Sequence, residues 1–223
     1  ARTVASIFPT ISATFSIVGA FMIDVDSSAS GSSIASRSRA TVVCVTERLP
    51  AVMIAALPAA TAIGHREGTR LLQVYWLAST RPGLPVENPR QVSAFLYPGE
   101  YGPRSPTFSR AALVYPPGQE LLFVSGTASI VGHQSVHLGD VAAQTRESLD
   151  NIEAVLAEAQ RLSPQGAFAL ADLSYRVYIR HAADLGAVRA EMAGRVASAE
   201  TLYLQADVCR SDLLVEIEGQ CVR

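Results

Sequence analysis

The sequence contains no lysine, since all 18 of its basic residues are arginines. This absence excludes Schiff-base catalysis and the lysine of a phosphate-binding P-loop. The formal net charge is −2, so the chain has no basic field of the kind that binds nucleic acid non-specifically. The apolar stretch 11–25 is too short and too often interrupted by Ser, Thr and Gly to span a bilayer. We therefore expect neither a nucleic-acid nor a membrane partner.

Cysteine is also scarce. Cys44, Cys209 and Cys221 lie far apart and show no CxxC spacing, so we expect neither a disulfide framework nor a zinc site. This usage is typical of a reducing compartment, and we expect the protein to be cytoplasmic. The motifs GxSxG, HExxH, GxxxxGK[ST] and GxGxxG are missing, which leaves the commonest hydrolase, metalloprotease and nucleotide-binding sites without support.

Two histidines have the spacing of a metal-binding pair. His133 and His137 are four residues apart, but Gly132 and Gly139 flank them and predict a loop rather than a helix. No cysteine or carboxylate stands beside them at metal-ligand spacing, so we interpret them as hydrogen-bonding loop residues. We expect no metal and no cofactor.

The composition, with 49% apolar and 17% charged residues, is that of a globular protein, and its character changes along the chain. Residues 1–52 are rich in Ser and Ala, contain a linker-like run at 26–33 and match no fold that we can assign. An Ala-rich stretch then leads into the apolar run 71–78, which has the length and aromatic content of a buried strand. A segment punctuated by Pro and Gly follows at 81–106, with a short strand expected at 92–97.

The second half of the chain has clear periodicity. Strands are predicted at 108–115 and 120–125, separated by a Pro-Pro-Gly turn at 116–118. Asp140 is the expected N-cap of a helix over 140–161, and a second amphipathic helix is expected over 184–196. Further strands are predicted at 172–181, 200–206 and 212–219. The order β-β-α-β-α-β-β predicts an α+β fold, with one sheet and two helices packed on one face.

Two segments give the first family resemblance. Residues 123–130 read as a strand ending in Ser-Gly, and 139–152 fit the helical pattern D-V-x-x-Q-x-x-x-x-L-x-N-I. In both respects the chain resembles the YjgF/Rid family, whose sheet with two helices is also described as chorismate-mutase-like. The resemblance implies a Rid-like catalytic domain at 96–223, and at 53–95 the remnant of an amino-terminal Rid-like domain with a linker. It also implies a homotrimer.

A narrower resemblance is carried by segments 85–94, 97–111, 125–133 and 209–218. These segments look like chorismatases, which release pyruvate from chorismate, and the likeness runs from about residue 58 to the end of the chain. Two alternatives remain: a Rid-type hydrolase of another small metabolite, and a catalytically silent Rid-like domain that binds or oligomerises. The first alternative is disfavoured because Glu200 stands where imine-hydrolysing relatives carry an arginine, and a carboxylate there would repel a carboxylate substrate.

Cleavage of the enol ether of chorismate requires protonation of its methylene carbon, which calls for a carboxylic acid that is neutral near pH 7. Glu216 lies in the apolar run 213–217, and by strand alternation it shares a face with Glu218. From the residues alone, the alternative is that both glutamates simply face solvent. With the resemblance, we predict Glu216 as the catalytic acid and Glu218 as a supporting group.

The resemblance also implies the residues that bind substrate. Arg104 and Arg110 are candidates to hold the two carboxylates of chorismate, because a guanidinium binds that group in bidentate fashion. The alternative for each arginine is a surface ion pair. Tyr101, Thr127 and Ala128 are expected to line the pocket.

Cys209 and Ala128 occupy the positions at which the resemblance implies that the product is decided. Capture of the cation by water gives a dihydroxycyclohexadiene carboxylate, whereas attack by the substrate's own ring hydroxyl gives 3-hydroxybenzoate. We expect Cys209 on the strand beside Glu216, able to shuttle the ring proton, and favour 3-hydroxybenzoate. The alternative is that Cys209 is a small buried hydrophobe of the core.

Overall fold

The computed structural model describes residues 16–24, 57–64, 73–79, 81–197 and 199–223. The linker-like run 26–33 and Cys44 lie outside these residues. The apolar run predicted as a strand at 71–78 is confirmed as β3 (Gln73–Ser79).

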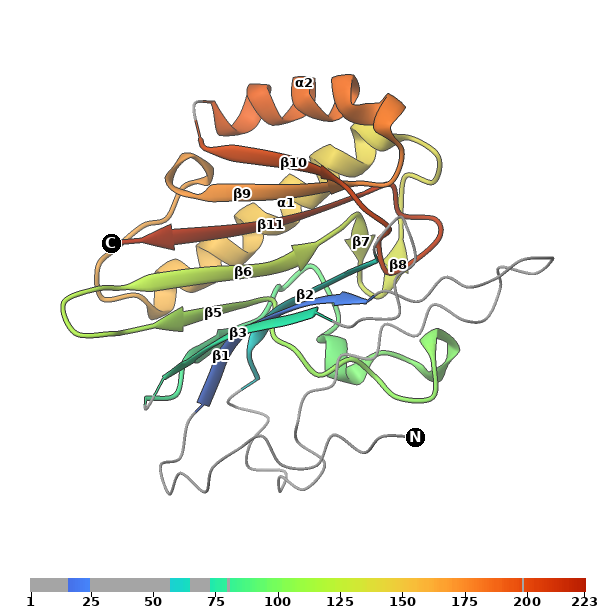
Figure 1. The fold of residues 1–223 in the computed structure, drawn as a ribbon. Coiled ribbons are helices and arrows are strands. Elements are labelled where there is room, and N and C mark those ends of the chain that lie inside the picture. The colour runs from blue at the N-terminus through green and yellow to red at the C-terminus, as the bar shows by residue number, and fades with distance from the viewer. Residues whose placement is uncertain (1–15, 25–56, 65–72, 80, 198) are drawn as a thin grey trace.

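A six-stranded sheet organises the molecule (Figure 1). Only β10 and β9 pair in parallel, and the remaining neighbours are antiparallel. β11 lies in the interior of the sheet, between β9 and β6, and its residues Ile217, Gly219 and Gln220 have a strand partner on both sides. In spatial order the strands are β10 (Thr201–Gln205), β9 (Ser174–Ile179), β11 (Val215–Val222), β6 (Leu121–Thr127), β5 (Ala111–Val114) and β4 (Leu84–Val86).

Two helices, α1 (Val141–Leu162) and α2 (Leu185–Val196), cover one face of this sheet (Figure 1). The side chain of Asp140 accepts a hydrogen bond from the Ala143 amide at 2.9 Å, which confirms the predicted N-cap. The buried stripe of α1 includes Leu149 and Ile152, both without solvent exposure. Burying such a side chain contributes about 1.5–3 kcal/mol, so this stripe holds the helix on the sheet. The predicted α+β arrangement is confirmed.

The opposite face of the six-stranded sheet is covered by a second, three-stranded sheet. A second sheet, formed by β2 (Ala59–Gly64), β1 (Ser16–Asp24) and β3, packs through β2 against β6 and β5. The Ala60 amide donates to Oγ of Ser125 at 2.9 Å. A short hairpin, β7 (Ile130–Val131) and β8 (Gln134–Ser135), follows β6. β2 therefore brings residues from early in the chain onto the face that carries Glu216.

The segments 92–97 and 116–118 both form turns. The strand expected at 92–97 is wrong: after one bridge from Gln91 to Gly132 the chain turns, and Ala94–Leu96 form a 3₁₀ turn closed by the Leu96 amide on the Ser93 carbonyl. The turn at 116–118 is confirmed, since the Gln119 amide donates to the Pro116 carbonyl and Gly118 adopts a φ of 75°.

Candidate active site

Glu216 lies on β11 directly opposite Tyr178 of β9, on the sheet face away from the helices. Alternation along β11 assigns Val215 and Ile217 to the helix side, where both are fully buried in the main core. Glu216 itself is only 4% exposed. The sequence alternative in which it faces solvent is therefore wrong, because the helix-free face of the sheet is covered at this point.

Gly126 of β6 makes room for the carboxyl group. A Cβ added at Gly126 would collide with Oε1 of Glu216 and with the side chain of Thr61. The Gly126 amide donates to Oγ1 of Thr61 at 2.8 Å, so this hydrogen bond joins β2 to β6 next to the Glu216 carboxyl group. Sequence reasoning missed both residues. The available signal was the Ser-Gly pair at the strand end, since glycine inside a strand marks the close approach of another group.

Glu218, the next residue on the same face of β11, is 2% exposed and held by two donors. Oε1 accepts from Nη1 of Arg176 at 2.9 Å and from the hydroxyl of Tyr178 at 3.0 Å. Its other oxygen, Oε2, has no hydrogen-bond partner among the described residues. The solvent-facing alternative is wrong for Glu218 as well. A buried carboxylate paired with an arginine thus stands one pleat away from Glu216.

This arrangement sets the protonation state of Glu216. Desolvation, followed by the negative charge of Glu218, raises the pKa of Glu216 to about 8. At pH 7 the side chain is therefore mostly a neutral carboxylic acid. A neutral acid is the form that can deliver a proton to a carbon atom.

Cys209 lies on the loop between β10 and β11 and is exposed, so the prediction that it sits on the neighbouring strand is wrong. The alternative of a buried core cysteine is also wrong. Desolvation, and secondly the charge of Glu216, raise the pKa of the Cys209 thiol to about 12, although the side chain keeps contact with solvent. The thiol is protonated at neutral pH in either environment. Val208 and Leu213 of the same loop pack in one cluster with Tyr178, the strand partner of Glu216, so the loop lies next to the part of the sheet that carries Glu216.

Ala128 and Thr127 follow Gly126 along the chain, and both are buried. Thr127 donates from Oγ1 to the Ser125 carbonyl at 2.7 Å, so its hydroxyl is engaged with the backbone. Ala128 belongs to a small apolar cluster that also contains Tyr178, the strand partner of Glu216. The members of this cluster are Ile63, Ala128, Ile130, Tyr178, Ala206, Val208 and Leu213.

Arg110 is 5% exposed, so it does not form a surface ion pair. Its Nη2 donates to the Val92 carbonyl at 2.9 Å and to the Tyr97 hydroxyl at 2.8 Å, and its guanidinium stacks over the rings of Tyr97 and Phe108. Its Nε has no partner among the described residues. A desolvated guanidinium with a free N–H is suited to an anionic group of a ligand.

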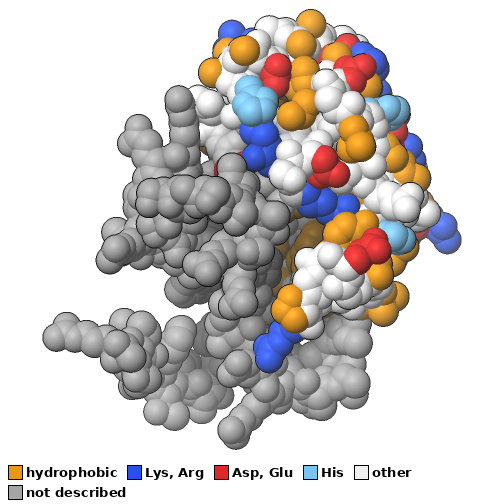
Figure 2. All heavy atoms as spheres, turned by 90° about the vertical axis from the view of Figure 1, so that its right-hand side faces the viewer, with side chains coloured by type: hydrophobic (Ala, Val, Ile, Leu, Met, Phe, Trp, Pro, Cys, Tyr) orange, Lys and Arg blue, Asp and Glu red, His pale blue; other side chains and the backbone are white. Residues whose placement is uncertain are grey.

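Tyr101 joins the same aromatic group, since its ring lies 5.6 Å from that of Tyr97. Its hydroxyl is 3.0 Å from Nδ1 of His133, and the Arg210 guanidinium lies 4.0 Å above its ring. Seen from the end of the molecule that carries β7 and β8, arginine, acidic and histidine side chains are interspersed (Figure 2). Arg104 is exposed, and none of these contacts involves it. The structure thus brings Tyr101 and Arg110 together through Tyr97.

The two loop histidines are held by hydrogen bonds. His133 contacts Tyr101, and Nε2 of His137 lies 3.3 Å from Oε2 of Glu147. In the part of the chain that the structure describes, no group of three His, Cys, Asp or Glu residues is arranged to hold a metal ion. No helix among these described residues is long and apolar enough to cross a membrane.

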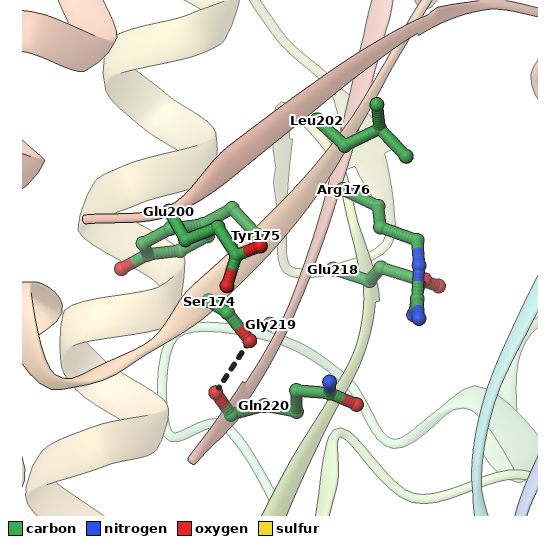
Figure 3. Close-up of a pocket in the computed structure, with 8 residues that line it drawn as sticks. All are labelled: Ser174, Tyr175, Arg176, Glu200, Leu202, Glu218, Gly219 and Gln220. Carbon is green, nitrogen blue, oxygen red and sulfur yellow. Dashed lines mark hydrogen bonds and ion pairs between the residues drawn. The ribbon is translucent and has the colours of Figure 1, made fainter.

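A pocket is lined by Glu218 and its neighbours on β9 and β10, and Glu216 is not among its lining residues (Figure 3). Arg176 and Glu218 lie next to each other in it, and Glu200 approaches from the start of β10. Glu200 is exposed and adds a second carboxylate to the lining. The lining residues are Ser174, Tyr175, Arg176, Glu200, Leu202, Glu218, Gly219 and Gln220.

Fold and site together define an α+β protein with a buried carboxylic acid that is neutral at pH 7, and with a buried arginine that donates to a tyrosine hydroxyl. No family model matches the chain. It is 47% identical to a chorismatase of Streptomyces rapamycinicus, over 74% of this chain and 51% of that relative. It is 46% identical to a 3-hydroxybenzoate synthase of Streptomyces hygroscopicus, over 73% of this chain and 50% of the relative.

A solved structure agrees. A crystal structure of a chorismatase superimposes with a TM-score of 0.70 at 40% identity, covering 75% of this chain and 52% of that one. Over about three quarters of its length the chain is therefore similar in sequence and in fold to chorismatases, in line with its sequence motifs. It spans about half the length of the curated relatives that it matches.

Proposed function

We propose that this chain forms the catalytic part of a chorismatase, which cleaves chorismate to pyruvate and a ring product. The observation that carries the proposal is the raised pKa of Glu216, buried on an interior strand beside the paired carboxylate of Glu218. The likeness to proteins named chorismatase and 3-hydroxybenzoate synthase supplies the substrate class. No cofactor is needed for the steps below.

The first step is proton transfer from Glu216 to the methylene carbon of the enolpyruvyl group. This forms a C–H bond and leaves an oxocarbenium ion at the ether carbon, while Glu216 becomes a carboxylate. General acid catalysis of this kind contributes about 10²–10⁴-fold to a rate. The carboxylate of Glu216 then lies close enough to the cation to stabilise it electrostatically.

Arg110 is the proposed partner of one substrate carboxylate, with Tyr101 beside it. The support for this assignment is the free Nε of Arg110 and the stacking of its guanidinium on Tyr97, which keeps the group rigid and desolvated. Arg104, which is exposed, is proposed for the second carboxylate on the resemblance alone. Thr127 and Ala128 are proposed to line the ring pocket.

Two products remain in the proposal. Addition of water to the cation gives a hemiketal that collapses to pyruvate and a dihydroxycyclohexadiene carboxylate. Attack by the neighbouring ring hydroxyl releases pyruvate and leaves an epoxide, which rearomatises to 3-hydroxybenzoate without net uptake of water. We favour 3-hydroxybenzoate, with the protonated thiol of Cys209 as the group that relays the ring proton.

A Rid-type imine hydrolase is the second candidate, and the pocket in Figure 3 speaks against it. Glu200 and Glu218 both line that pocket, so a carboxylate substrate would meet two carboxylates and one arginine that Glu218 already engages. A catalytically silent binding domain would not require a buried carboxylic acid with a raised pKa, which is typical of catalytic sites. A homotrimer and a cytoplasmic location are kept as proposals from the resemblance and the cysteine usage.

The test is incubation of the purified protein with chorismate, with pyruvate followed by a coupled dehydrogenase assay and the ring product identified by chromatography. The proposal expects pyruvate and ring product in equal amounts. An imine substrate generated in the same assay should yield no ammonia above background. Well-folded protein that releases no pyruvate would contradict the proposal and favour the silent domain.

A further inference from the structure

The loop Asp207–Leu214 connects β10 to β11 and carries Cys209 seven residues before Glu216. At its start, Asp207 exchanges two backbone hydrogen bonds with Gly64, at 2.8 and 2.9 Å. The Leu213 amide donates to the Arg210 carbonyl at 3.1 Å, which closes a turn. Five further bonds to the loop backbone come from two side chains elsewhere in the fold, Arg180 and Gln144.

The first of these side chains is Arg180, which directly follows β9. Its Nη2 donates to the carbonyl of Val208 at 3.0 Å and to that of Arg210 at 2.8 Å. Its Nε donates to the Leu213 carbonyl at 2.8 Å, and its Nη1 pairs with the carboxylate of Asp207. One guanidinium therefore spans the loop from its first residue to its seventh, a use that needs several donors in a fixed plane.

The second side chain is Gln144 of α1, which has no solvent exposure. Its Nε2 donates to the Asp212 carbonyl at 2.9 Å, and its Oε1 accepts from the Leu214 amide at 2.7 Å. A neighbouring strand would bond a chain in the same way, through the carbonyl of one residue and the amide of the second residue after it. The carboxamide of Gln144 thus replaces a missing strand just before β11 begins.

We propose that Arg180 and Gln144 are positioning residues that fix the loop Asp207–Leu214 and thereby hold Cys209 beside Glu216. Arg180 follows β9 and Gln144 belongs to α1, so the loop is bonded to two separate parts of the fold. Val208 and Leu213 of the same loop pack with Ala128 in one apolar cluster, which closes this side of the site. A loosened loop would move the thiol away from Glu216 and admit water.

The consequence for product choice rests on the proposed function. Water capture and intramolecular capture compete for the same cation, and only the second requires a closed site with a group that relays the ring proton. Weakening either Arg180 or Gln144 should therefore shift the product from 3-hydroxybenzoate towards the diol. Loss of fold stability alone would lower the total yield without changing the product ratio.

The test uses Arg180→Lys and Gln144→Met in the full chain. Lysine keeps the positive charge near Cys209 but cannot reach three carbonyls at once, and methionine keeps the volume of Gln144 without its hydrogen bonds. Arg195→Lys is the matched control, because Arg195 also makes two guanidinium contacts, to Asp150 and Glu153, at a distance from the loop.

Two readouts are taken for each variant. Cys209 is exposed, but its raised thiol pKa keeps the reactive thiolate scarce. When the loop moves away from Glu216 this pKa should fall, so alkylation of Cys209 by iodoacetamide, followed peptide by peptide in a mass spectrometer, should accelerate at least tenfold in both variants and stay unchanged in Arg195→Lys. Cys221, which is buried, is the internal reference. The diol fraction among the ring products should rise at least threefold in both variants.

Alkylation rates equal to those of the wild type in both variants would overturn the proposal. Faster alkylation with an unchanged product ratio would overturn it too, because the two side chains would then serve only the fold. If the wild type releases no pyruvate, the proposed function fails by itself, and the alkylation rates alone decide whether the loop is held as inferred. Because the two variants remove different hydrogen bonds to the loop, either one decides the matter if the other does not fold.

Discussion

Replacing Glu216 with Gln should change how the stability of the protein depends on pH. The pKa of Glu216 is raised from 4.5 to about 8 in the folded state. Between these values the folded protein keeps the proton that the unfolded chain loses, so the folded state binds more protons. The free energy of unfolding should therefore fall as the pH rises from about 4.5 to 8, and this contribution should level off above pH 8.

The size of the effect follows from the shift. Each unit of pKa corresponds to about 1.36 kcal/mol, so a shift from 4.5 to about 8 sets an upper limit of roughly 5 kcal/mol. Since Glu216 is 4% exposed, screening by solvent removes little of it. Glutamine is nearly isosteric and carries no titrating proton. Relative to the wild type, Glu216→Gln should gain a few kcal/mol between pH 5 and pH 8.5, a large share of the 5–15 kcal/mol typical of a domain.

The assay is urea denaturation followed by far-ultraviolet circular dichroism at pH 5, 6, 7 and 8.5, for the wild type and the variant. Glu200→Gln is the control, because Glu200 is an exposed carboxylate. Other groups titrate in this range, but their contributions cancel in the difference between the two proteins. A difference that stays constant within about 0.5 kcal/mol from pH 5 to pH 8.5 would refute the raised pKa, and with it the assignment of Glu216 as a neutral acid.

Gly126→Ala should destabilise the protein by about 1–3 kcal/mol and impair turnover, because the new methyl group displaces the Glu216 carboxyl. The control is Gly194→Ala, whose new methyl group meets no atom within 4 Å and should leave stability unchanged. Equal urea midpoints for the two variants would contradict the close packing at Gly126. Arg110→Ala should raise KM for chorismate about ten- to hundredfold and Arg110→Lys less, in line with roughly 1.5–3 kcal/mol for a charge-assisted hydrogen bond; an unchanged KM in both would remove Arg110 from binding. Cys209→Val should raise the diol fraction seen by chromatography, and an unchanged product ratio would exclude Cys209 from product choice.

The features predicted well from the sequence are those fixed by local chemistry. The N-cap at Asp140 and the apolar stripe through Leu149 and Ile152 specify α1 within one stretch of chain. The alternation around Glu216 likewise gives its face on β11 without knowledge of any partner. That the face is buried came from the family resemblance, since alternation alone left the solvent-facing reading open.

The features that were missed depend on contacts between distant segments. Gly126 and Thr61 are 65 residues apart, and only the packing of β2 on β6 brings them around the Glu216 carboxyl. Cys209 was expected on the strand beside Glu216, but it lies on a loop whose backbone is hydrogen-bonded by the side chains of Arg180 and Gln144. The sequence pattern cannot show that distant side chains form the backbone hydrogen bonds that a neighbouring strand would otherwise form.

The most direct test of the central claim is the rate of pyruvate release from chorismate by Glu216→Gln, measured together with binding of a non-reactive aromatic dicarboxylate. If Glu216 is the acid, turnover should fall by about 10²–10⁴-fold or more, while the dissociation constant of the dicarboxylate stays within a few-fold of the wild-type value. Glu218→Gln should retain more activity than Glu216→Gln, because Glu218 does not deliver the proton. Retention of more than a tenth of the wild-type turnover by Glu216→Gln would contradict the account.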